Sequence, residues 1–113
     1  MRKEPAMTTA HHNVYVVELD PEVMEDHKFQ RENPGWDGSQ DCLYVGSTGL
    51  TPRQRFTNHK DGHKANRYVR KYGQKLRPDL YRKYNPMTWM EAGSRESQLA
   101  SDLRAGGYAV WQR

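Results

Sequence analysis

Hydrophobic and polar positions alternate in two short segments of the chain, and each segment predicts a β-strand. Residues 13–19, Asn-Val-Tyr-Val-Val-Glu-Leu, are rich in β-branched and aromatic side chains and end at Asp20. Residues 42–46, Cys-Leu-Tyr-Val-Gly, alternate in the same way, and we expect Gly46 and Gly49 to bracket the turn that follows. Together the two segments predict the centre of a small sheet.

Two capping signals predict the main helices. Thr51 and Gln54 form the threonine-x-x-glutamine pattern of a capping box, and Gly62 ends the helix that they open. Thr88 and Glu91 repeat this pattern and open a longer helix, which reaches about residue 105 before a pair of glycines.

The remaining elements have weaker patterns. Gly73, at a C′ position, closes a helix, and prolines at positions 78 and 86 flank a short strand. The sequence therefore predicts an α+β fold in which a small antiparallel three-stranded sheet is flanked by helices. The additional segments are helices at about 21–29 and 64–72, a third strand at 79–84, and a terminal strand or extended tail at 108–111 that covers the sheet.

The composition limits the chain to one domain. Of 113 residues, 35% are hydrophobic and 28% are charged, which suffices for one modest core. We expect a flexible tail at 1–12 and a single domain at 13–113. Residues 20–41 hold seven acidic residues against two basic ones and contain turn signals, so they predict a solvated insertion that Phe29 and Trp36 pin to the domain. This insertion could also border or fill a binding groove.

The single cysteine, Cys42, excludes an intramolecular disulfide and a cysteine-rich zinc site. Its place in an apolar strand predicts a core residue and fits a reducing compartment. No segment has the length of a membrane span, and the first residues lack the apolar core of a signal peptide. We therefore expect a cytoplasmic protein that does not bind a membrane.

Positive charge is concentrated in one part of the chain. The formal net charge is +4, yet residues 53–83 alone carry +9, and the rest of the chain carries −5. A basic region with interleaved aromatics is typical of nucleic-acid binding, although a solvated basic face is the simpler alternative. The predicted phosphate-contacting residues are Arg53, Lys64, Asn66, Arg67, Arg70 and Lys71.

Candidate chemistry lies on both predicted helices. Arg55 and His59 are four residues apart, so they share one helix face close to Tyr44 of the preceding strand, as a phosphate-handling site requires. On the last helix, Glu96 falls on the same side as the apolar stripe that includes Leu99. A carboxylate on a packed helix face needs a partner or a metal ion.

In their order, these residues resemble the motifs of the GIY-YIG nuclease family, over nearly the whole chain from residue 13. Asn13-Val14-Tyr15 is similar to the Gly-Ile-Tyr motif, and Tyr44-Val45-Gly46 to the Tyr-Ile-Gly motif. The family arginine falls on Arg55, the histidine or tyrosine four residues later on His59, and the metal-binding glutamate on Glu96. Asparagine stands where the family has its first glycine, and the spacer between the tyrosine motifs is longer than usual.

The resemblance implies a metal-dependent endonuclease that hydrolyses phosphodiester bonds, with DNA as the expected substrate. Glu96 would hold one divalent cation, Mg²⁺ or alternatively Mn²⁺, and Arg55 would bind the scissile phosphate as a fork. Tyr15 or Tyr44 would accept the proton of the attacking water, which requires nearby positive charge because a tyrosine pKa is about 10. His59 would assist the tyrosine or bind phosphate.

Several alternatives remain open on sequence grounds. A non-catalytic nucleic-acid-binding module would retain the fold and the basic face, and a protein-interaction domain would use the acidic insertion. His59 and His63 have the spacing of zinc ligands on a helix, but Gly62 is expected to end the helix between them. No separate recognition domain is apparent, so a homodimer or a protein partner would supply sequence specificity.

Overall fold

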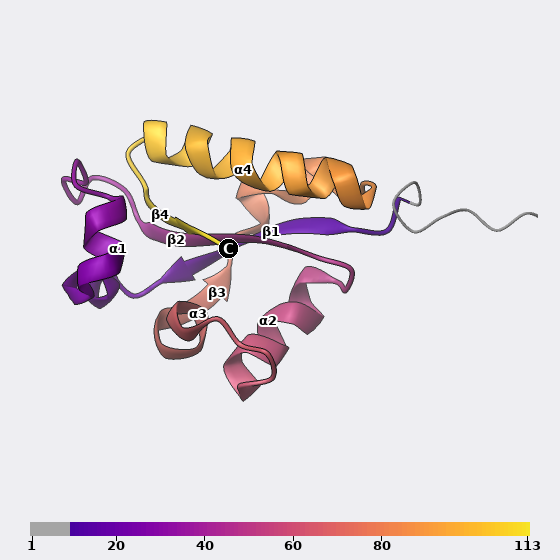
Figure 1. Ribbon diagram of the computed structural model, residues 1–113, viewed down its shortest axis with the longest axis horizontal. Coiled ribbons are helices and arrows are strands. Elements are labelled where there is room, and N and C mark those ends of the chain that lie inside the picture. The colour runs from indigo at the N-terminus through magenta and orange to yellow at the C-terminus, as the bar shows by residue number, and fades with distance from the viewer. Residues whose placement is uncertain (1–9) are drawn as a thin grey trace, which may run out of the picture.

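The protein is a three-layer α+β domain built around a mixed sheet. The computed structural model describes residues 10–113, and Figure 1 shows the sheet nearly edge-on between two helical layers. The sheet has four strands in the order β3-β1-β2-β4, with β1 antiparallel to both β2 and β3, and β4 parallel to β2. The strands are β1 (Asn13–Leu19), β2 (Cys42–Thr48), β3 (Gly73–Leu76) and β4 (Ala109–Gln112).

The helices divide between the two faces of the sheet. In Figure 1, α4 lies along one face, α2 and α3 lie on the other, and α1 lies at one end of the sheet. The capping boxes of Thr51 and Thr88 are both present, and Gly62 ends α2 with a φ of +86°, so these three predictions are confirmed. The α-helices are α1 (His27–Glu32), α2 (Pro52–Asp61), α3 (Arg67–Tyr72) and α4 (Trp89–Ala105), and the 3-10 helices are η2 (Pro21–Glu25), η3 (Pro78–Leu80) and η4 (Arg82–Tyr84).

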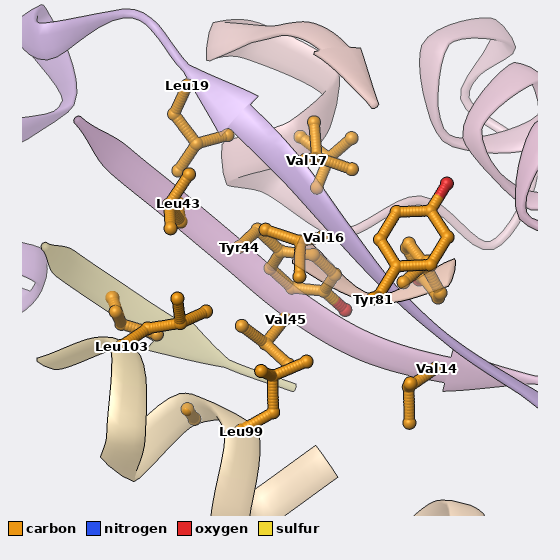
Figure 2. Packing of buried hydrophobic residues seen from close by; sticks show 14 of the residues in the cluster. Val14, Val16, Val17, Leu19, Leu43, Tyr44, Val45, Tyr81, Leu99 and Leu103 are labelled. Carbon is orange, nitrogen blue, oxygen red and sulfur yellow. The ribbon is translucent and has the colours of Figure 1, made fainter. Parts of the chain in front are cut away.

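The two central strands are buried on both sides. Every residue of β1 from Val14 to Val17 is fully buried, because alternate residues face α4 and the α2–α3 layer. Figure 2 shows Leu99 and Leu103 of α4 near Val45 of β2. This packing fixes which side chains of β1 and β2 can reach each helical layer. Cys42 is buried, as expected of a core residue.

The α+β class and the flanking helices are confirmed, but the prediction of a three-stranded antiparallel sheet is wrong at one edge. Residues beyond α4 pair in parallel with β2, from Ala109 opposite Cys42 to Gln112 opposite Val45. The turn that reverses the chain after α4 uses Gly107 at a φ of +99°, a conformation that glycine adopts without strain. Of the two alternatives expected for residues 108–111, a terminal strand or an extended tail, the strand is therefore confirmed, and it is the fourth strand of the sheet.

The third strand was predicted in the wrong place. Residues 79–84 form the 3-10 helices η3 and η4, because Pro78 has no N–H for a strand ladder and local turns satisfy the backbone, including Leu80 N to Arg77 O at 2.9 Å. The strand that pairs with β1 is β3, which begins at Gly73. Gly73 has a φ of −64°, so it starts this strand and is not a left-handed helix terminus.

The expected turn between Gly46 and Gly49 is also wrong, since β2 continues to Thr48. Gly46 lies opposite Tyr15, and a Cβ at this position would lie 2.8 Å from the Tyr15 hydroxyl oxygen. The requirement for glycine at residue 46 is therefore close approach of the backbone to an aromatic side chain, and not an unusual backbone conformation.

Two predicted helices differ in their bounds because aspartate and asparagine side chains start new helices, although the second of them ends at Tyr72 as predicted. The helix expected at 21–29 is divided into η2 and α1, since the Asp26 carboxylate accepts hydrogen bonds from the N–H groups of Lys28 and Phe29. The helix expected at 64–72 begins three residues later, because the Asn66 side chain caps α3.

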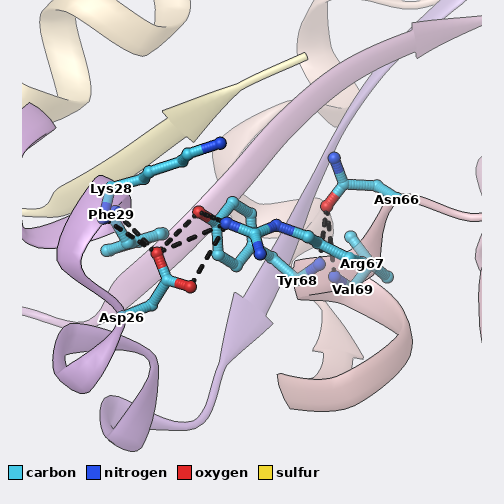
Figure 3. A network of polar contacts seen from close by, with 7 residues as sticks. All are labelled: Asp26, Lys28, Phe29, Asn66, Arg67, Tyr68 and Val69. Carbon is cyan, nitrogen blue, oxygen red and sulfur yellow. Dashed lines mark hydrogen bonds and ion pairs between the residues drawn. The ribbon is translucent and has the colours of Figure 1, made fainter.

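The acidic insertion is exposed over most of its length, as expected, and a few of its residues are anchored in the domain. Phe29 and Asn33 are buried, and Trp36 packs partly against the core, which confirms the pinning role predicted for Phe29 and Trp36. Asp26 also accepts a hydrogen bond from the Tyr68 hydroxyl at 2.8 Å and pairs with Arg67 at 3.2 Å, as Figure 3 shows. The insertion is thus joined to α3 and β4.

Within residues 10–113, no helix combines the length and the apolar character needed to cross a membrane. Most of the flexible tail predicted at 1–12 lies outside the described residues. Its last residue, His12, forms an isolated antiparallel bridge with Met87.

Candidate active site

The centre of the candidate site is a hydrogen bond between Tyr15 and His59. Tyr15 comes from β1 and His59 from the last turns of α2, and both side chains are fully buried. The Tyr15 hydroxyl oxygen lies 2.8 Å from Nε2 of His59, and the Tyr44 ring meets the His59 ring edge-on at 5.6 Å between centroids. The fold therefore brings together three of the residues that the sequence singled out.

The hydrogen bonds of His59 define its tautomer. The backbone N–H of Asn66 donates to Nδ1 at 2.9 Å, so the proton of the neutral ring is on Nε2 and is donated to the Tyr15 oxygen. Burial, together with the nearby charge of Arg55, lowers the pKa of His59 to about 4. At neutral pH His59 is therefore an uncharged hydrogen-bond donor to Tyr15, and it is not a cation that attracts phosphate.

Burial also has the largest effect on the pKa values of the two tyrosines. It raises the pKa of Tyr15 far above that of a free tyrosine, and the charges of Arg55 and Arg113 offset this only in part. Burial raises the pKa of Tyr44 as well, and the charges of Arg113 and Arg55 act in the opposite direction. Arg55 lowers the pKa of each tyrosine, as the sequence predicts, but the desolvation of each hydroxyl outweighs the arginine charge.

Arg55 lies on α2 beside a cleft of about 410 Å³. Its Nη2 donates to the Lys64 carbonyl at 2.7 Å and its Nη1 to the His63 carbonyl at 3.3 Å. These bonds hold the guanidinium against the loop after α2 and leave other N–H groups free to bind a ligand. We call this the Arg55 cleft, which is lined by His12, Ser47, Thr48, Gly49, Leu50, Arg55, Asn58, His63, Lys64, Trp89 and Arg113.

Glu96 lies on α4, on the opposite face of the sheet, beside a second cleft of about 560 Å³. The residue is buried, and its two carboxylate oxygens accept hydrogen bonds from Ser47 Oγ and Gln112 Nε2, each at 2.9 Å. The sequence predicts that this carboxylate needs a partner or a metal ion, and in the structure two neutral hydrogen-bond donors are its partners. We call this the Glu96 cleft, which is lined by Ser47, Trp89, Met90, Gly93, Ser94, Glu96 and Arg113.

The two clefts meet at the edge of the sheet and share Ser47, Trp89 and Arg113. β4 pairs with β2 as far as Val45, and beyond that point Arg113 Nη1 donates to the Ser47 carbonyl at 3.1 Å. Burial is the main cause of the raised pKa of Tyr44, and the charge of Glu96 acts in the same direction. The described residues that line the clefts include none from 20–41.

The predicted phosphate-contacting residues are dispersed. Lys64 lines the Arg55 cleft, whereas Arg53 borders a separate groove with Phe56 and Tyr81. Arg67 pairs with Asp26, and the Asn66 side chain is used to cap α3 (Figure 3). The remaining two lie on α3: Arg70 packs near Gly62, and the Lys71 ammonium lies 5.2 Å from the centre of the Tyr72 ring.

Sequence reasoning missed four residues of the site. Ser47 is two residues after Val45 in β2, so the alternation of side chains along a strand places both on the face that α4 covers. There Ser47 contacts Glu96. No comparable signal in the sequence indicates the other three residues. Gln112 and Arg113 reach the site only because β4 pairs in parallel with β2, and Trp89 reaches it because α4 begins there.

Glu96 is the candidate metal ligand of the site. Among residues 10–113, no group of three or more histidine, cysteine, aspartate or glutamate side chains could hold a metal ion. Glu96 is the carboxylate that borders the Glu96 cleft, and each of its oxygens keeps a free lone pair beside its hydrogen bond. The arrangement suits a hard cation held by one carboxylate and by water.

Comparisons of the chain with protein-family models, with curated proteins and with solved structures found no match.

Proposed function

We propose that this protein is a metal-dependent endonuclease of the GIY-YIG type that hydrolyses phosphodiester bonds of DNA. The observation that carries the proposal is that Arg55 and Glu96, from opposite faces of the sheet, border adjoining clefts that share Ser47 and Arg113. A phosphodiester held at this junction would have a guanidinium on one side and a carboxylate on the other. In this proposal β3, β1 and β2 are the three antiparallel strands of the family, and β4 is an addition.

The cation in this proposal is Mg²⁺, or alternatively Mn²⁺, held by Glu96. When bound, such an ion supplies positive charge to the phosphate and lowers the pKa of a coordinated water. Ser47 and Gln112 orient the carboxylate of Glu96 through their hydrogen bonds, and each oxygen keeps a second lone pair for the cation.

Arg55 is the phosphate-binding group. Phosphodiester hydrolysis places additional negative charge on the phosphate oxygens, and a guanidinium binds two of them at once. The two backbone carbonyls that Arg55 contacts fix the direction of this fork before substrate binds. Arg113, which borders both clefts and donates to the Ser47 carbonyl, adds a second positive charge at their junction.

Tyr15 or Tyr44 accepts the proton of the attacking water in this proposal. His59 donates its Nε2 proton to the Tyr15 oxygen, and a phenolate at Tyr15 would accept the same hydrogen bond. His59 therefore assists Tyr15, and the cations of the clefts supply the positive charge that either tyrosine needs.

The test is a cleavage assay over single-stranded, duplex and branched DNA and over RNA, with Mg²⁺ or Mn²⁺. Glu96→Gln retains the size and much of the hydrogen bonding of the side chain but removes its charge, so metal-dependent cleavage should fall by about 100-fold or more. Glu91→Gln is the matched control, since glutamine also serves in a capping box. Full activity of Glu96→Gln would contradict the assignment.

One observation favours the alternative of a non-catalytic nucleic-acid-binding module. Tyr15, Tyr44 and His59 are fully or almost fully buried, and they contact one another rather than lining either cleft. A binding module would show salt-sensitive affinity for DNA but would cut no substrate in the same assay.

A further inference from the structure

The side chain of Trp89 is exposed, and neither packing in the core nor capping of the helix accounts for a tryptophan at this position. It is the first residue of α4 and is 58% exposed, whereas Trp36 and Trp111 pack against the core. The capping box at this helix terminus is made by Thr88 and Glu91, so the indole is not needed for it. Exposed aromatic side chains of this kind are characteristic of contact sites.

The surroundings of Trp89 define what it could contact. It borders both the Arg55 cleft and the Glu96 cleft, together with Arg113. Trp89, Gly93 and Glu96 recur at i, i+4 and i+7, so they share one face of α4. A Cβ at Gly93 would meet no atom within 4 Å, which leaves the helix surface between the indole and the carboxylate open.

We propose that Trp89 is a stacking platform for one unpaired nucleobase of a DNA strand whose phosphate occupies the junction of the two clefts. This inference rests on the proposed function and specifies its substrate class. An aromatic ring beside guanidinium groups is the arrangement that binds single strands, because the ring stacks on a base and the cations bind the phosphates. In an intact duplex both faces of each base are covered, so the substrate has an unpaired nucleotide next to the scissile phosphate.

The experiment separates base stacking from phosphate binding and needs no cleavage. Fluorescence anisotropy in EDTA compares a labelled single-stranded oligodeoxynucleotide with a strand that has the same number of phosphates but abasic sugars. The wild-type protein should bind the base-containing strand at least about fivefold more tightly, which is the lower end of the effect of one stacked base. Equal affinity of the wild-type protein for both strands would overturn the inference.

Two variants of Trp89 complete the test. Trp89→Leu keeps an apolar side chain but has no π face, so it should lose most of the preference for bases while binding the abasic strand as wild type does. Trp89→Phe keeps an aromatic ring and should restore part of the preference. Because the residue is exposed, both variants should have wild-type thermal unfolding curves. A Trp89→Leu protein that keeps the full preference for bases would also overturn the inference.

The outcomes are separable from those of the nuclease assay. Cleavage that depends on Glu96, with no loss of base preference in Trp89→Leu, would refute the stacking role alone. Base-dependent binding through Trp89, with no cleavage of any substrate, would support the stacking role and refute the nuclease proposal.

Discussion

The hydroxyl oxygen of Tyr15 accepts a hydrogen bond from Nε2 of His59 at 2.8 Å, inside the protein and out of contact with solvent. The bond connects the first strand to the helix that carries Arg55. It also depends on Asn66, whose backbone N–H occupies the other ring nitrogen and so fixes the proton on Nε2. Burial thus keeps His59 uncharged, Asn66 fixes its tautomer, and the bond to Tyr15 joins the ring to β1.

The first prediction concerns the stability that this bond provides. Tyr15→Phe leaves the Nε2–H of His59 buried without an acceptor, so the free energy of unfolding should decrease by about 1–3 kcal/mol. Tyr81→Phe is the matched control, because the Tyr81 ring is buried as well and its hydroxyl makes no hydrogen bond to the described residues. Urea denaturation of both variants checks the prediction, and equal losses would contradict it.

The second prediction is a pH dependence of stability that originates at His59. Folding lowers the pKa of this residue from 6.5 to about 4, so between these values the unfolded chain binds a proton that the folded protein does not bind. The stability from the neutral ring is complete above pH 6.5 and is lost as the pH falls toward 4, by about 2–3 kcal/mol.

Other acids titrate in the same range, so the measurement is a comparison with His59→Gln. The amide of glutamine can reach the same partners but does not titrate. The difference in unfolding free energy between wild type and His59→Gln should shrink as the pH is lowered from 7 to 4. A difference that is independent of pH would show that His59 does not have the depressed pKa.

Local signals made part of this fold predictable. The capping boxes of Thr51 and Thr88 involve residues three apart, so their hydrogen bonds form within one turn and can be read from the sequence. Strand alternation likewise placed Tyr15 and Tyr44 correctly on β1 and β2. The pairing of these tyrosines with His59 follows once α2 packs on the face of the sheet that they share.

Long-range pairing was not predictable in the same way. β4 joins β2 in parallel only because α4 returns the chain to that edge, and with β4 come Gln112 beside Glu96 and Arg113 beside Ser47. The burial of the tyrosines also depends on the complete fold. Desolvation therefore affects their pKa values more than the nearby arginine does. The arginine can be predicted from the sequence, but the desolvation cannot.

The third prediction concerns Gly46. An added Cβ would lie 2.8 Å from the Tyr15 hydroxyl oxygen and 2.9 Å from the adjacent ring carbon, so Gly46→Ala must displace the ring from His59. Overpacking of this kind destabilises a protein by about 1–3 kcal/mol. Urea denaturation measures this loss, and the near-ultraviolet circular dichroism of the tyrosines should change with it.

A glycine in open space provides the control. Gly93 is inside α4, and a Cβ there would meet no atom within 4 Å. Gly93→Ala should therefore raise stability by about 0.5–1 kcal/mol, because alanine has the higher helix propensity. If Gly46→Ala were as stable as wild type, the close approach of β2 to Tyr15 would be incorrect.

The fourth prediction is that Arg55 acts through the shape of its guanidinium as well as through its charge. Arg55→Ala should lower kcat for DNA cleavage by about 100- to 1,000-fold, the usual effect of removing one donor that stabilises a developing negative charge. Arg55→Lys keeps the charge but cannot bind two phosphate oxygens in a plane, nor hold both carbonyls of the loop at residues 63–64, so it should recover only a small part of the activity.

The Arg55 variants need a control that changes the net charge equally, and Arg31→Ala provides it, since Arg31 is exposed on α1 and borders neither cleft. Arg31→Ala should cleave at close to the wild-type rate. Single-turnover measurements at saturating protein separate the chemical step from binding, so a loss confined to affinity would assign Arg55 to substrate binding alone. Wild-type turnover by Arg55→Lys would mean that charge is sufficient and that the fork geometry is not used.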